Sequence, residues 1–353
     1  MAVITILGAG VMGSAMCMPA ADRGHEVRLV GTHLDTAIVD SVKSAGRHSR
    51  LAVRLPASVT AFQHTEFAAA LGDDTDILLL GVAAAGVPWA IERICAAAAK
   101  PLTVLMITKG IAPKPDHLAT LPDEVFAQVK ARTGIAHRLA AIGGPCIAGE
   151  LAARRHTGTA IASREAGLAD SLCGMLATDY YHPRPSADLT GVEICAAFKN
   201  FFAIAVGWAA GRLELEPKAE NNALNHNPAA ILFDQAIAEM LALVRHHGGS
   251  DASVWGMPGA GDLYVTCQAG RNSRLGRHLG QGLTYPQIKA GPMQEDTVEG
   301  AETGIAAAAT LRSLMTAGLL DPALMPLTTA LLATLTENAP FTVPWERLHR
   351  AAG

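Results

Sequence analysis

The chain has 353 residues, of which half are hydrophobic and 17% are charged, and its formal net charge at pH 7 is −4. This length exceeds what one hydrophobic core normally organises, so we expect two domains. The slight negative charge gives no general attraction to nucleic acid or to an anionic membrane, so any phosphate binding must be local.

The chain begins with an apolar, β-branched run, Val3–Leu7, which breaks into GAGVMG at residues 8–13. The run is typical of a buried parallel strand, and residues 14–23 have a helical pattern. A second apolar run at 26–30 completes a strand, a helix and a strand in the length that a dinucleotide-binding βαβ unit needs. The opening therefore predicts a dinucleotide site, with a merely structural glycine turn as the alternative.

Each glycine of this GxGxxG turn has a separate physical use. Gly8 would allow the tight turn out of the strand, Gly10 would let the backbone approach a pyrophosphate, and Gly13 would let the helix pack closely on the strand. The phosphates would lie at the helix N-terminus, where backbone N–H groups and the helix dipole favour an anion.

The turn after the second strand bears on the choice of nucleotide. In this type of domain an acidic residue at that point commonly binds the adenosine ribose, whereas a basic residue accommodates a 2′-phosphate. Asp35 comes late in the turn, and Thr32 and His33 could accept either nucleotide, so both NAD and NADP stay open. An ordinary turn without a ligand is the alternative.

Further apolar runs predict more buried strands, at residues 76–82, 102–107, 139–142 and 159–162, with 180–183 as the last edge of the sheet. Ligands of an open parallel sheet bind beyond the carboxyl ends of its strands. Lys109 follows one of these runs and precedes a glycine, which favours a ligand role over a solvated surface role.

The pattern changes after Asp188. Apolar residues recur at helical spacing through residues 191–212, 229–247, 303–317 and 325–336, whereas the polar stretch 211–228 predicts a loop. We therefore expect an α/β Rossmann-type dinucleotide-binding domain over residues 1–188, followed by an all-α substrate and catalytic domain over residues 189–353.

Lys199 lies in the middle of the first helical stretch, within the sequence AAFKN. A lysine is costly to bury without a partner, so it either reaches the surface or faces a polar cleft. Burial lowers the pKa of a lysine and suits it to proton transfer near neutral pH, which a carbonyl reductase needs in its acid. The local sequence leaves both possibilities open.

A second polar island lies at residues 256–272. Asp262 follows small residues that allow close approach of another segment, and Thr266 would share its helix face. Arg271 and Asn272 follow a glycine and supply a guanidinium, an amide and backbone N–H groups, which are donors that suit a phosphate. A capped surface loop is the alternative.

Other features indicate a cytoplasmic protein without a metal site. Six cysteines are scattered with no CxxC pair, which indicates reduced thiols. His246 and His247 have no further ligand at suitable spacing and favour a surface pair over a metal centre. The N-terminal apolar run is a poor signal peptide, and the stretch 201–210 is too short to span a bilayer.

Six motifs follow one another along the chain: GAGVMG at 8–13, TKG at 108–110, GGPCIAGE at 143–150, AAFKN at 196–200, GAGDLYVTCQAGRN at 259–272 and TVEG at 297–300. In this order and spacing they resemble the NAD(P)-dependent glycerol-3-phosphate dehydrogenase family. The resemblance implies a Rossmann domain with a helical domain, and NAD or NADP as cofactor. It also implies a small phosphorylated three-carbon substrate, a homodimer, and a role in glycerophospholipid metabolism. Hydride would pass between the nicotinamide and C2 of dihydroxyacetone phosphate or glycerol 3-phosphate.

The same resemblance assigns roles to residues. Lys199 would be the proton donor and acceptor, with Lys109 and Asp262 setting its charge and the position of the substrate. The substrate would be held by Lys109, Gly144, Cys146, Asn200, Thr266, Arg271 and Asn272. The cofactor would contact Gly8, Gly10, Val11, Met12, Gly13, Thr32, Lys109, Ala148, Arg271 and Glu299.

The chain also departs from the family pattern, and these departures concern the substrate more than the reaction. They are Val11-Met12 in place of an aromatic residue, Val82-Ala83-Ala84 in place of Val-Pro-Ser, Cys146-Ile147 in place of Ser-Phe, and no arginine near Phe233 and Asp234. One alternative is a paralogue that acts on another polyol phosphate or hydroxy acid. A non-catalytic nucleotide sensor is a further alternative, but it would have no need of the proton-transfer pair Lys199 and Asp262.

Overall fold

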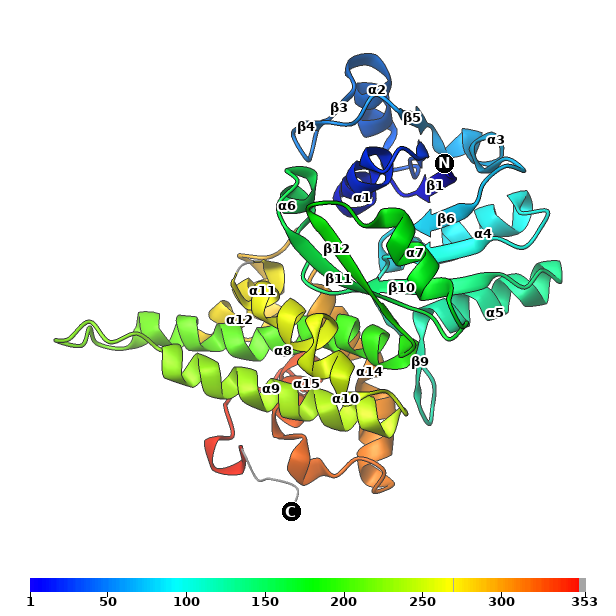
Figure 1. The fold of residues 1–353 in the computed structure, drawn as a ribbon. Coiled ribbons are helices and arrows are strands. Elements are labelled where there is room, and N and C mark those ends of the chain that lie inside the picture. The colour runs from blue at the N-terminus through cyan, green and yellow to red at the C-terminus, as the bar shows by residue number, and fades with distance from the viewer. Residues whose placement is uncertain (269, 349–353) are drawn as a thin grey trace. The chain divides into compact units, whose positions relative to one another are not determined.

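The computed structural model describes residues 1–268 and 270–348 (Figure 1). Ala269, which belongs to the motif at 259–272, lies outside the described residues. So do residues 349–353, the end of the second predicted domain.

The chain divides into two units. The first comprises Met1–Gly110 and Thr120–Leu189, and the second comprises Ile111–Ala119 with the chain from Thr190 onward. The segment 111–119, which the sequence-based division placed in the first domain, packs with the second unit because Leu118 is buried in that unit's core.

The first unit is built on an eight-stranded sheet with the order β12-β11-β10-β7-β6-β1-β2-β5 (Figure 1). Neighbouring strands are parallel, except that β10 and β11 are antiparallel. From β5 to β10 the order is that of the doubly wound dinucleotide-binding fold, with its switch point between β1 and β6. The strands are β1 Val3–Leu7, β2 Glu26–Val30, β5 Val59–Phe62, β6 Ile77–Leu80, β7 Thr103–Met106, β10 Arg138–Gly143, β11 Thr157–Ala162 and β12 Tyr181–Ser186. The predicted Rossmann-type domain is confirmed.

The strands at the centre of this sheet are continuous apolar runs because both of their faces are covered. Every residue of Ile77–Leu80 is at most 2% exposed. The connections carry the helices α1 Val11–Asp22, α2 Thr36–Ala45, α3 Phe67–Leu71, α4 Val87–Ala97, α5 Leu121–Thr133, α6 Ala148–Ala152 and α7 Leu168–Leu176. Short 3-10 turns lie at His64–Glu66 and Ala84–Gly86, and two small hairpins pair β3 Arg47–His48 with β4 Val53–Arg54 and β8 Ile111–Pro113 with β9 Leu118–Thr120.

The second unit is helical, as the sequence predicts. Its helices are α8 Leu189–Leu215, α9 His226–His246, α10 Asp251–Trp255, α11 Asp262–Gln268, α12 Arg271–Gly280, α13 Tyr285–Ala290, α14 Glu299–Thr316 and α15 Pro326–Glu337. A π-helical turn, Met257–Gly261, leads directly into α11, and 3-10 turns lie at Pro322–Leu324 and Trp345–Arg347. The polar stretch predicted as a loop over 211–228 is shorter in the structure, because α8 extends to Leu215 and α9 begins at His226.

α8 is the core helix of the second unit. It has 27 residues, and every residue from 191 to 207 is buried. Phe198, Phe201 and Phe202 are fully buried, with ring centroids 5.3–6.3 Å apart. By length and hydropathy alone α8 and α9 could each cross a membrane, but 94% of the apolar window of α8 is buried inside the protein, against 44% for α9. The apolar character of α8 is therefore explained by its place in the core.

Close contact between the backbones of α8 and α12 depends on glycine. A Cβ on Gly276 would lie 1.9 Å from the carbonyl oxygen of Ile204, and a Cβ on Gly211 would lie 1.9 Å from that of Arg277. No side chain fits in so short a gap, so the helices meet backbone to backbone. This approach fixes α12 against the second half of α8.

The start of α15 is held by a buried carboxylate from α9. Glu239 is 0% exposed, and its oxygens accept the N–H groups of Leu327 and Thr328 at 2.6 and 2.7 Å and the Thr328 hydroxyl at 2.6 Å. Burial raises the pKa of Glu239 to about 7, and these hydrogen bonds oppose the rise. The contact ties α9 to α15 within the second unit.

The two adjacent histidines at the end of α9 are both half-buried rather than exposed. The ring of His247 uses both nitrogens on backbone groups, since Nε2 accepts the N–H of Leu118 at 3.0 Å and Nδ1 lies 2.8 Å from the carbonyl oxygen of Leu243. This ring therefore holds the segment 111–119 against the second unit. Within the described part of the chain, no group of three or more His, Cys, Asp or Glu residues is arranged to hold a metal ion.

We expect Gly276→Ala to destabilise the second unit by roughly 2 kcal/mol or more, because the added methyl group must push α12 away from α8. Urea unfolding followed by tryptophan fluorescence measures this loss. Three of the four tryptophans, Trp208, Trp255 and Trp345, lie in that unit.

Gly174→Ala is the matched control, because Gly174 is also inside a helix and its added Cβ would meet nothing within 4 Å. Its stability should stay the same or rise by up to about 1 kcal/mol. If both variants unfolded at the same urea concentration as the unaltered protein, the close approach of α8 and α12 would not be needed for stability.

Candidate active site

Close backbone contacts shape the glycine-rich turn between β1 and α1. Gly8 has a φ of +118°, and a Cβ there would lie 2.7 Å from the carbonyl group of Gly81 at the end of β6. A Cβ on Gly13 would lie 2.1 Å from the carbonyl oxygen of Gly8. The protein's own packing therefore requires both glycines, Gly8 at the switch point of the sheet and Gly13 where α1 meets the turn.

Gly10 is different, because nothing in the protein requires a glycine there. It caps α1 with a φ of −65°, which any residue can adopt, and a Cβ on it would meet nothing within 4 Å. The first bond inside α1 runs from the Ser14 N–H to the Gly10 carbonyl at 3.0 Å, so the N–H groups of residues 11–13 belong to the open helix start. The first turn contains no acidic side chain. This open space in front of backbone donors fits the pyrophosphate of a dinucleotide.

Four of the predicted residues gather around the start of α1. The Sδ of Met12 lies 3.9 Å from the Sγ of Cys146, which comes from the loop after β10. Ala148 begins α6, and α6 packs against α1. Val11 stays 39% exposed at the helix start.

Asp35 closes the turn after β2. Its Oδ2 accepts both the N–H and the hydroxyl of Thr32, each at 2.8 Å, and the residue is buried. The Asp35 carboxylate, which the sequence suggests as a ligand of the ribose, therefore already forms hydrogen bonds within the turn. Thr32 is half-buried and His33 is exposed. This geometry is compatible with NAD and with NADP.

Two further predicted residues follow β7 and β10. Lys109 lies just beyond β7 and is half-buried. The buried Thr108 before it donates its hydroxyl to the carbonyl of Val82 at 2.7 Å, which ties the ends of β7 and β6 together. Gly144 follows β10 with a φ of +136°. Because these strands are parallel, their carboxyl ends lie at the same edge of the sheet as the glycine-rich turn.

Lys199 is the centre of a polar cluster in the second unit. Its side chain is 7% exposed, and its Nζ lies 2.5 Å from Oδ1 of Asp262, whose side chain is 3% exposed. The Nζ also donates to the hydroxyl of Thr266 at 3.0 Å, and that hydroxyl donates to the backbone carbonyl of Asp262 at 2.6 Å. Asp262 begins α11 and Thr266 lies one turn later, so the predicted shared helix face is confirmed.

The two charges stabilise each other where both side chains are almost fully removed from solvent. Removing an ammonium or a carboxylate from water costs several kcal/mol for each ion, so Lys199 and Asp262 are tolerated only as a pair. Of the two possibilities for Lys199, reaching the surface is therefore ruled out. Burial raises the pKa of the nearby Cys267 thiol to about 12, against the opposing effect of the Lys199 ammonium, so this thiol stays protonated.

A hydrogen-bonded network lies next to this pair. The amide of Asn272 donates to Oδ1 of Asn200 at 2.9 Å and accepts the N–H of Gly300 at 2.9 Å. The amide of Asn200 donates to Glu299 at 3.2 Å, and Arg271 pairs with the other oxygen of Glu299 at 3.5 Å. Both side chains of this ion pair are about half exposed, at 47% and 54%, so the pair adds little to stability. Each side-chain amide, of Asn200 and of Asn272, has a second N–H that takes part in none of these hydrogen bonds.

The structure thus brings most predicted residues into one group in each unit. In the first unit the group is Gly8, Gly10, Val11, Met12, Gly13, Gly144, Cys146 and Ala148, with Thr32 and Lys109 at neighbouring strand ends. In the second unit it is Lys199, Asn200, Asp262, Thr266, Arg271, Asn272 and Glu299.

Two side chains that touch the glycine-rich turn are missing from the sequence-based predictions. Ser14 and His48 both lie within hydrogen-bond distance of the Ala9 carbonyl oxygen. Ser14 directly follows the GxGxxG motif and could have been noticed from its position. His48 lies in a two-residue strand without an apolar alternation, so no sequence signal points to it.

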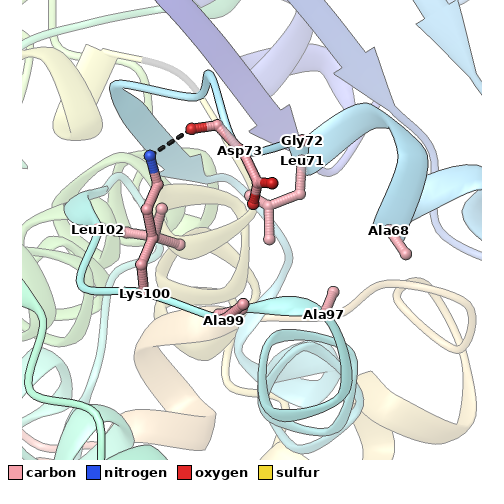
Figure 2. A pocket seen from close by; sticks show the side chains of 9 residues that line it. Ala68, Leu71, Gly72, Asp73, Ala97, Ala99, Lys100 and Leu102 are labelled. Atoms are coloured by element: carbon pink, nitrogen blue, oxygen red, sulfur yellow. Dashed lines mark hydrogen bonds between the residues drawn. The ribbon is translucent and has the colours of Figure 1, made fainter.

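A pocket of about 200 Å³ lies elsewhere in the first unit (Figure 2). It is lined by the ends of α3 and α4 and by the segment before β7, including Asp73, Lys100 and Leu102. These residues precede strands, so the pocket lies at the amino ends of the sheet, opposite to the edge where a doubly wound sheet binds its ligand. It is not part of the candidate active site.

Comparison with known proteins identifies the family of this chain. Residues 3–169 match the family described as NAD-dependent glycerol-3-phosphate dehydrogenase N-terminus, and residues 188–345 match the corresponding C-terminus family. An NADP(+)-dependent glycerol-3-phosphate dehydrogenase from Archaeoglobus fulgidus is 33% identical over 81% of this chain and 82% of its own length. A glycerol-3-phosphate dehydrogenase described as NAD(P)+-dependent, from Halorhodospira halophila, is 33% identical over 88% of this chain and 86% of its own length.

Solved structures give the same result. The crystal structure of glycerol-3-phosphate dehydrogenase from Coxiella burnetii superposes with a TM-score of 0.78 at 27% identity, covering 98% of this chain and 97% of that one. The glycerol-3-phosphate dehydrogenase of Plasmodium falciparum shares the fold, with a TM-score of 0.81 at 18% identity over 100% of this chain and 96% of that one.

We expect Gly10→Val to abolish nucleotide binding without unfolding the first unit. Valine can adopt the backbone angles of Gly10, and its side chain would enter the open space that fits the pyrophosphate. Titration of NADH and NADPH fluorescence should show affinity reduced by roughly a hundredfold or more, a loss of about 2.7 kcal/mol.

Gly174→Val serves as the control, because its side chain also enters open space but lies on α7, away from the turn. It should bind both nucleotides normally. Normal binding by a folded Gly10→Val variant would place the cofactor elsewhere.

Proposed function

Because the chain belongs to the NAD-dependent glycerol-3-phosphate dehydrogenase family, we propose that it interconverts glycerol 3-phosphate and dihydroxyacetone phosphate with NAD or NADP. The reaction is an oxidoreduction of a CH–OH group. The observation that carries the proposal is the buried contact of Lys199 with Asp262 and Thr266, since a binding module has no need of a desolvated lysine held in this way.

The groups present can complete the reduction of the ketone. When bound, the reduced nicotinamide would supply the hydride that C2 accepts, and the carbonyl electron pair would move onto the C2 oxygen. Lys199 gives that oxygen a proton from Nζ and later regains one from solvent, so one hydride and one proton are consumed for each ketone reduced. The Asp262 carboxylate beside it favours the ammonium form of Lys199 before transfer, while Thr266 keeps Nζ in place. The oxidation of glycerol 3-phosphate reverses these steps.

The start of α12 suits the phosphate of the substrate. Gly270 has a φ of +123°, which favours glycine, and the first bond of the helix runs from the Arg274 N–H to its carbonyl at 3.1 Å. The backbone N–H groups before it, the Arg271 guanidinium and the Asn272 amide together form a set of donors for a dianion. Binding energy from this non-reacting end would position C2 for reaction.

We extend the proposal to the remaining site residues. Asn200, Thr266, Lys109, Gly144 and Cys146 would hold the substrate. The cofactor would lie on the turn at Gly8, Gly10, Val11, Met12 and Gly13, and its further ligands would be Thr32, Lys109, Ala148, Arg271 and Glu299. Residues 1–188, apart from the segment 111–119, would thus serve as the cofactor domain, and residues 189–353 as the substrate domain.

We also propose a cytoplasmic homodimer that supplies glycerol 3-phosphate to glycerophospholipid synthesis. The six cysteines, all present as free thiols, support a reducing compartment. The family resemblance supports the dimer and the pathway. Light scattering on the purified protein measures the subunit number.

A direct assay tests the proposed reaction. The purified protein is offered dihydroxyacetone phosphate, dihydroxyacetone and other phosphorylated ketones, each with NADH or NADPH, while absorbance of the reduced nicotinamide is followed. Turnover should be fastest with dihydroxyacetone phosphate. Faster turnover of a different polyol phosphate or of an unphosphorylated hydroxy acid would overturn the substrate assignment and leave the dehydrogenase fold in place.

We predict that Lys199→Ala lowers kcat by roughly three decades or more, because both the proton donor and the charge that stabilises the C2 oxygen are lost. Nucleotide affinity should stay nearly unchanged. Stopped-flow turnover and nucleotide titration measure the two effects separately.

Removing Lys199 alone leaves a buried carboxylate without its partner, which can cost about 3–5 kcal/mol of stability. The double variant Lys199→Met with Asp262→Asn removes both charges and should fold, with the same loss of kcat. Lys289→Ala is the control, since Lys289 is a partly buried lysine of the same unit that donates to the carbonyl of Met293. More than about a tenth of the activity remaining in the Lys199 variants would rule out general acid catalysis by this residue.

We predict that Arg271→Lys lowers kcat/KM for dihydroxyacetone phosphate by roughly a hundredfold, about 2–3 kcal/mol, because a point charge cannot replace the two parallel bonds of a guanidinium. Activity on dihydroxyacetone, which lacks the phosphate, should hardly change. Nucleotide affinity is measured separately and divided out.

Arg274→Lys is the matched control, because Arg274 is an equally exposed arginine of α12 that pairs with Asp296. It should leave both substrates unaffected. Equal losses on phosphorylated and unphosphorylated substrate in Arg271→Lys would mean that Arg271 does not bind the phosphate, and the paralogue with another substrate would become the better interpretation.

A further inference from the structure

Two buried side chains hold the carbonyl oxygen of Ala9, the residue between the first two glycines of the turn. The Nε2 of His48 lies 3.0 Å from this oxygen, and the Oγ of Ser14 lies 3.3 Å from it. Both side chains are 0% exposed. His48 belongs to the β3–β4 hairpin, which comes after α2, so the contact joins this hairpin to the glycine-rich turn.

A single neutral tautomer of His48 satisfies both of its contacts. Its Nδ1 lies 3.0 Å from the backbone nitrogen of Leu51, which can only donate, so Nδ1 is the acceptor and carries no proton. In a neutral imidazole the other nitrogen then carries the proton. The Nε2–H therefore donates to the carbonyl of Ala9, and the ring orientation is fixed at both ends.

Holding this carbonyl also fixes the N–H of the next residue. In a planar trans peptide the C=O of one residue and the N–H of the next point in opposite directions, and the described residues contain no cis peptide. The Ala9 carbonyl points inward to His48 and Ser14, so the Gly10 N–H points away from them. Gly10 is also the residue whose added Cβ would meet nothing within 4 Å.

We propose that His48 is a positioning residue of the cofactor site, which, together with Ser14, aims the Gly10 N–H at the pyrophosphate of the nicotinamide dinucleotide. The inference rests on the proposed nucleotide-dependent function. A backbone donor to a phosphate oxygen makes a charge-assisted hydrogen bond, and its strength depends on direction. A turn already held in the bound orientation loses less conformational freedom when the nucleotide binds.

Two substitutions separate the contact with the turn from the contact inside the hairpin. His48→Asn keeps an acceptor near the position of Nδ1 and has no atom near that of Nε2, so it keeps the Leu51 contact and loses the Ala9 contact. His48→Gln places an amide nitrogen near the position of Nε2, so it keeps the Ala9 contact and loses the Leu51 contact. His137→Asn is the control, because the Nδ1 of His137 also accepts a backbone N–H, that of Leu102, at the amino end of β7.

Dissociation constants for NADH and NADPH are measured by fluorescence titration, and kcat is measured at saturating nucleotide. His48→Asn should raise both dissociation constants by about tenfold, the value of one lost hydrogen bond, with kcat within about twofold of the unaltered protein. His48→Gln and His137→Asn should bind nucleotide nearly normally. If His48→Asn does not fold, Ser14→Ala provides the test, with an expected rise of about threefold.

The opposite pattern would overturn the inference. Normal binding by a folded His48→Asn variant, or weak binding by His48→Gln with normal binding by His48→Asn, would show that the ring serves only the hairpin. Failure of the unaltered protein to bind either nucleotide would refute the proposed function instead.

Discussion

A positive charge buried inside an apolar helix is the constraint on which the second unit depends. Lys199 lies in a stretch of α8 where every residue is buried, and an unpaired ammonium there would cost several kcal/mol, comparable with the whole net stability of a domain. The carboxylate of Asp262 must therefore be buried as deeply as Lys199 and lie beside it. It does so because Gly259 in the π-helical turn before it passes so close to α10 that an added Cβ would lie 2.2 Å from the carbonyl of Val254.

The same need for close approach explains the glycines on the neighbouring helices. A Cβ on Gly300, at the start of α14, would lie 2.2 Å from the carbonyl oxygen of Asn200, and Gly276 brings α12 equally close to α8. Three helices thus meet backbone to backbone just after the lysine, with α14 approaching α8 at Asn200 and α12 approaching it one turn later at Ile204. Asn272 can bond to Asn200 and to the Gly300 N–H only because this approach is so short. The amide donors of Asn200 and Asn272 that are proposed for the substrate are therefore held in place by packing.

The parts of the fold that have a local signal could be predicted from the sequence. The strands appear as apolar runs, the GxGxxG turn has its own spacing, and the change to helical periodicity after Asp188 marks the second domain. The bonds between Asn200, Asn272 and Glu299 join residues far apart in the chain, and nothing near any of them predicts the others. His48 was missed for the same reason, as was the packing of segment 111–119 with the second unit, which depends on Leu118 and His247.

Two positive charges of the proposed substrate site, Lys199 and Arg271, differ in how easily they can change partners. Lys199 and Asp262 are both almost fully buried, so separating them would leave two desolvated ions. Arg271 and Glu299 are about half exposed and 3.5 Å apart, so water screens this pair and its loss costs little. An incoming phosphate can therefore replace Glu299 as the partner of Arg271, while the buried pair of Lys199 and Asp262 stays intact. This difference in burial would let Arg271 exchange partners in each catalytic cycle and keep Lys199 fixed at the reacting carbon.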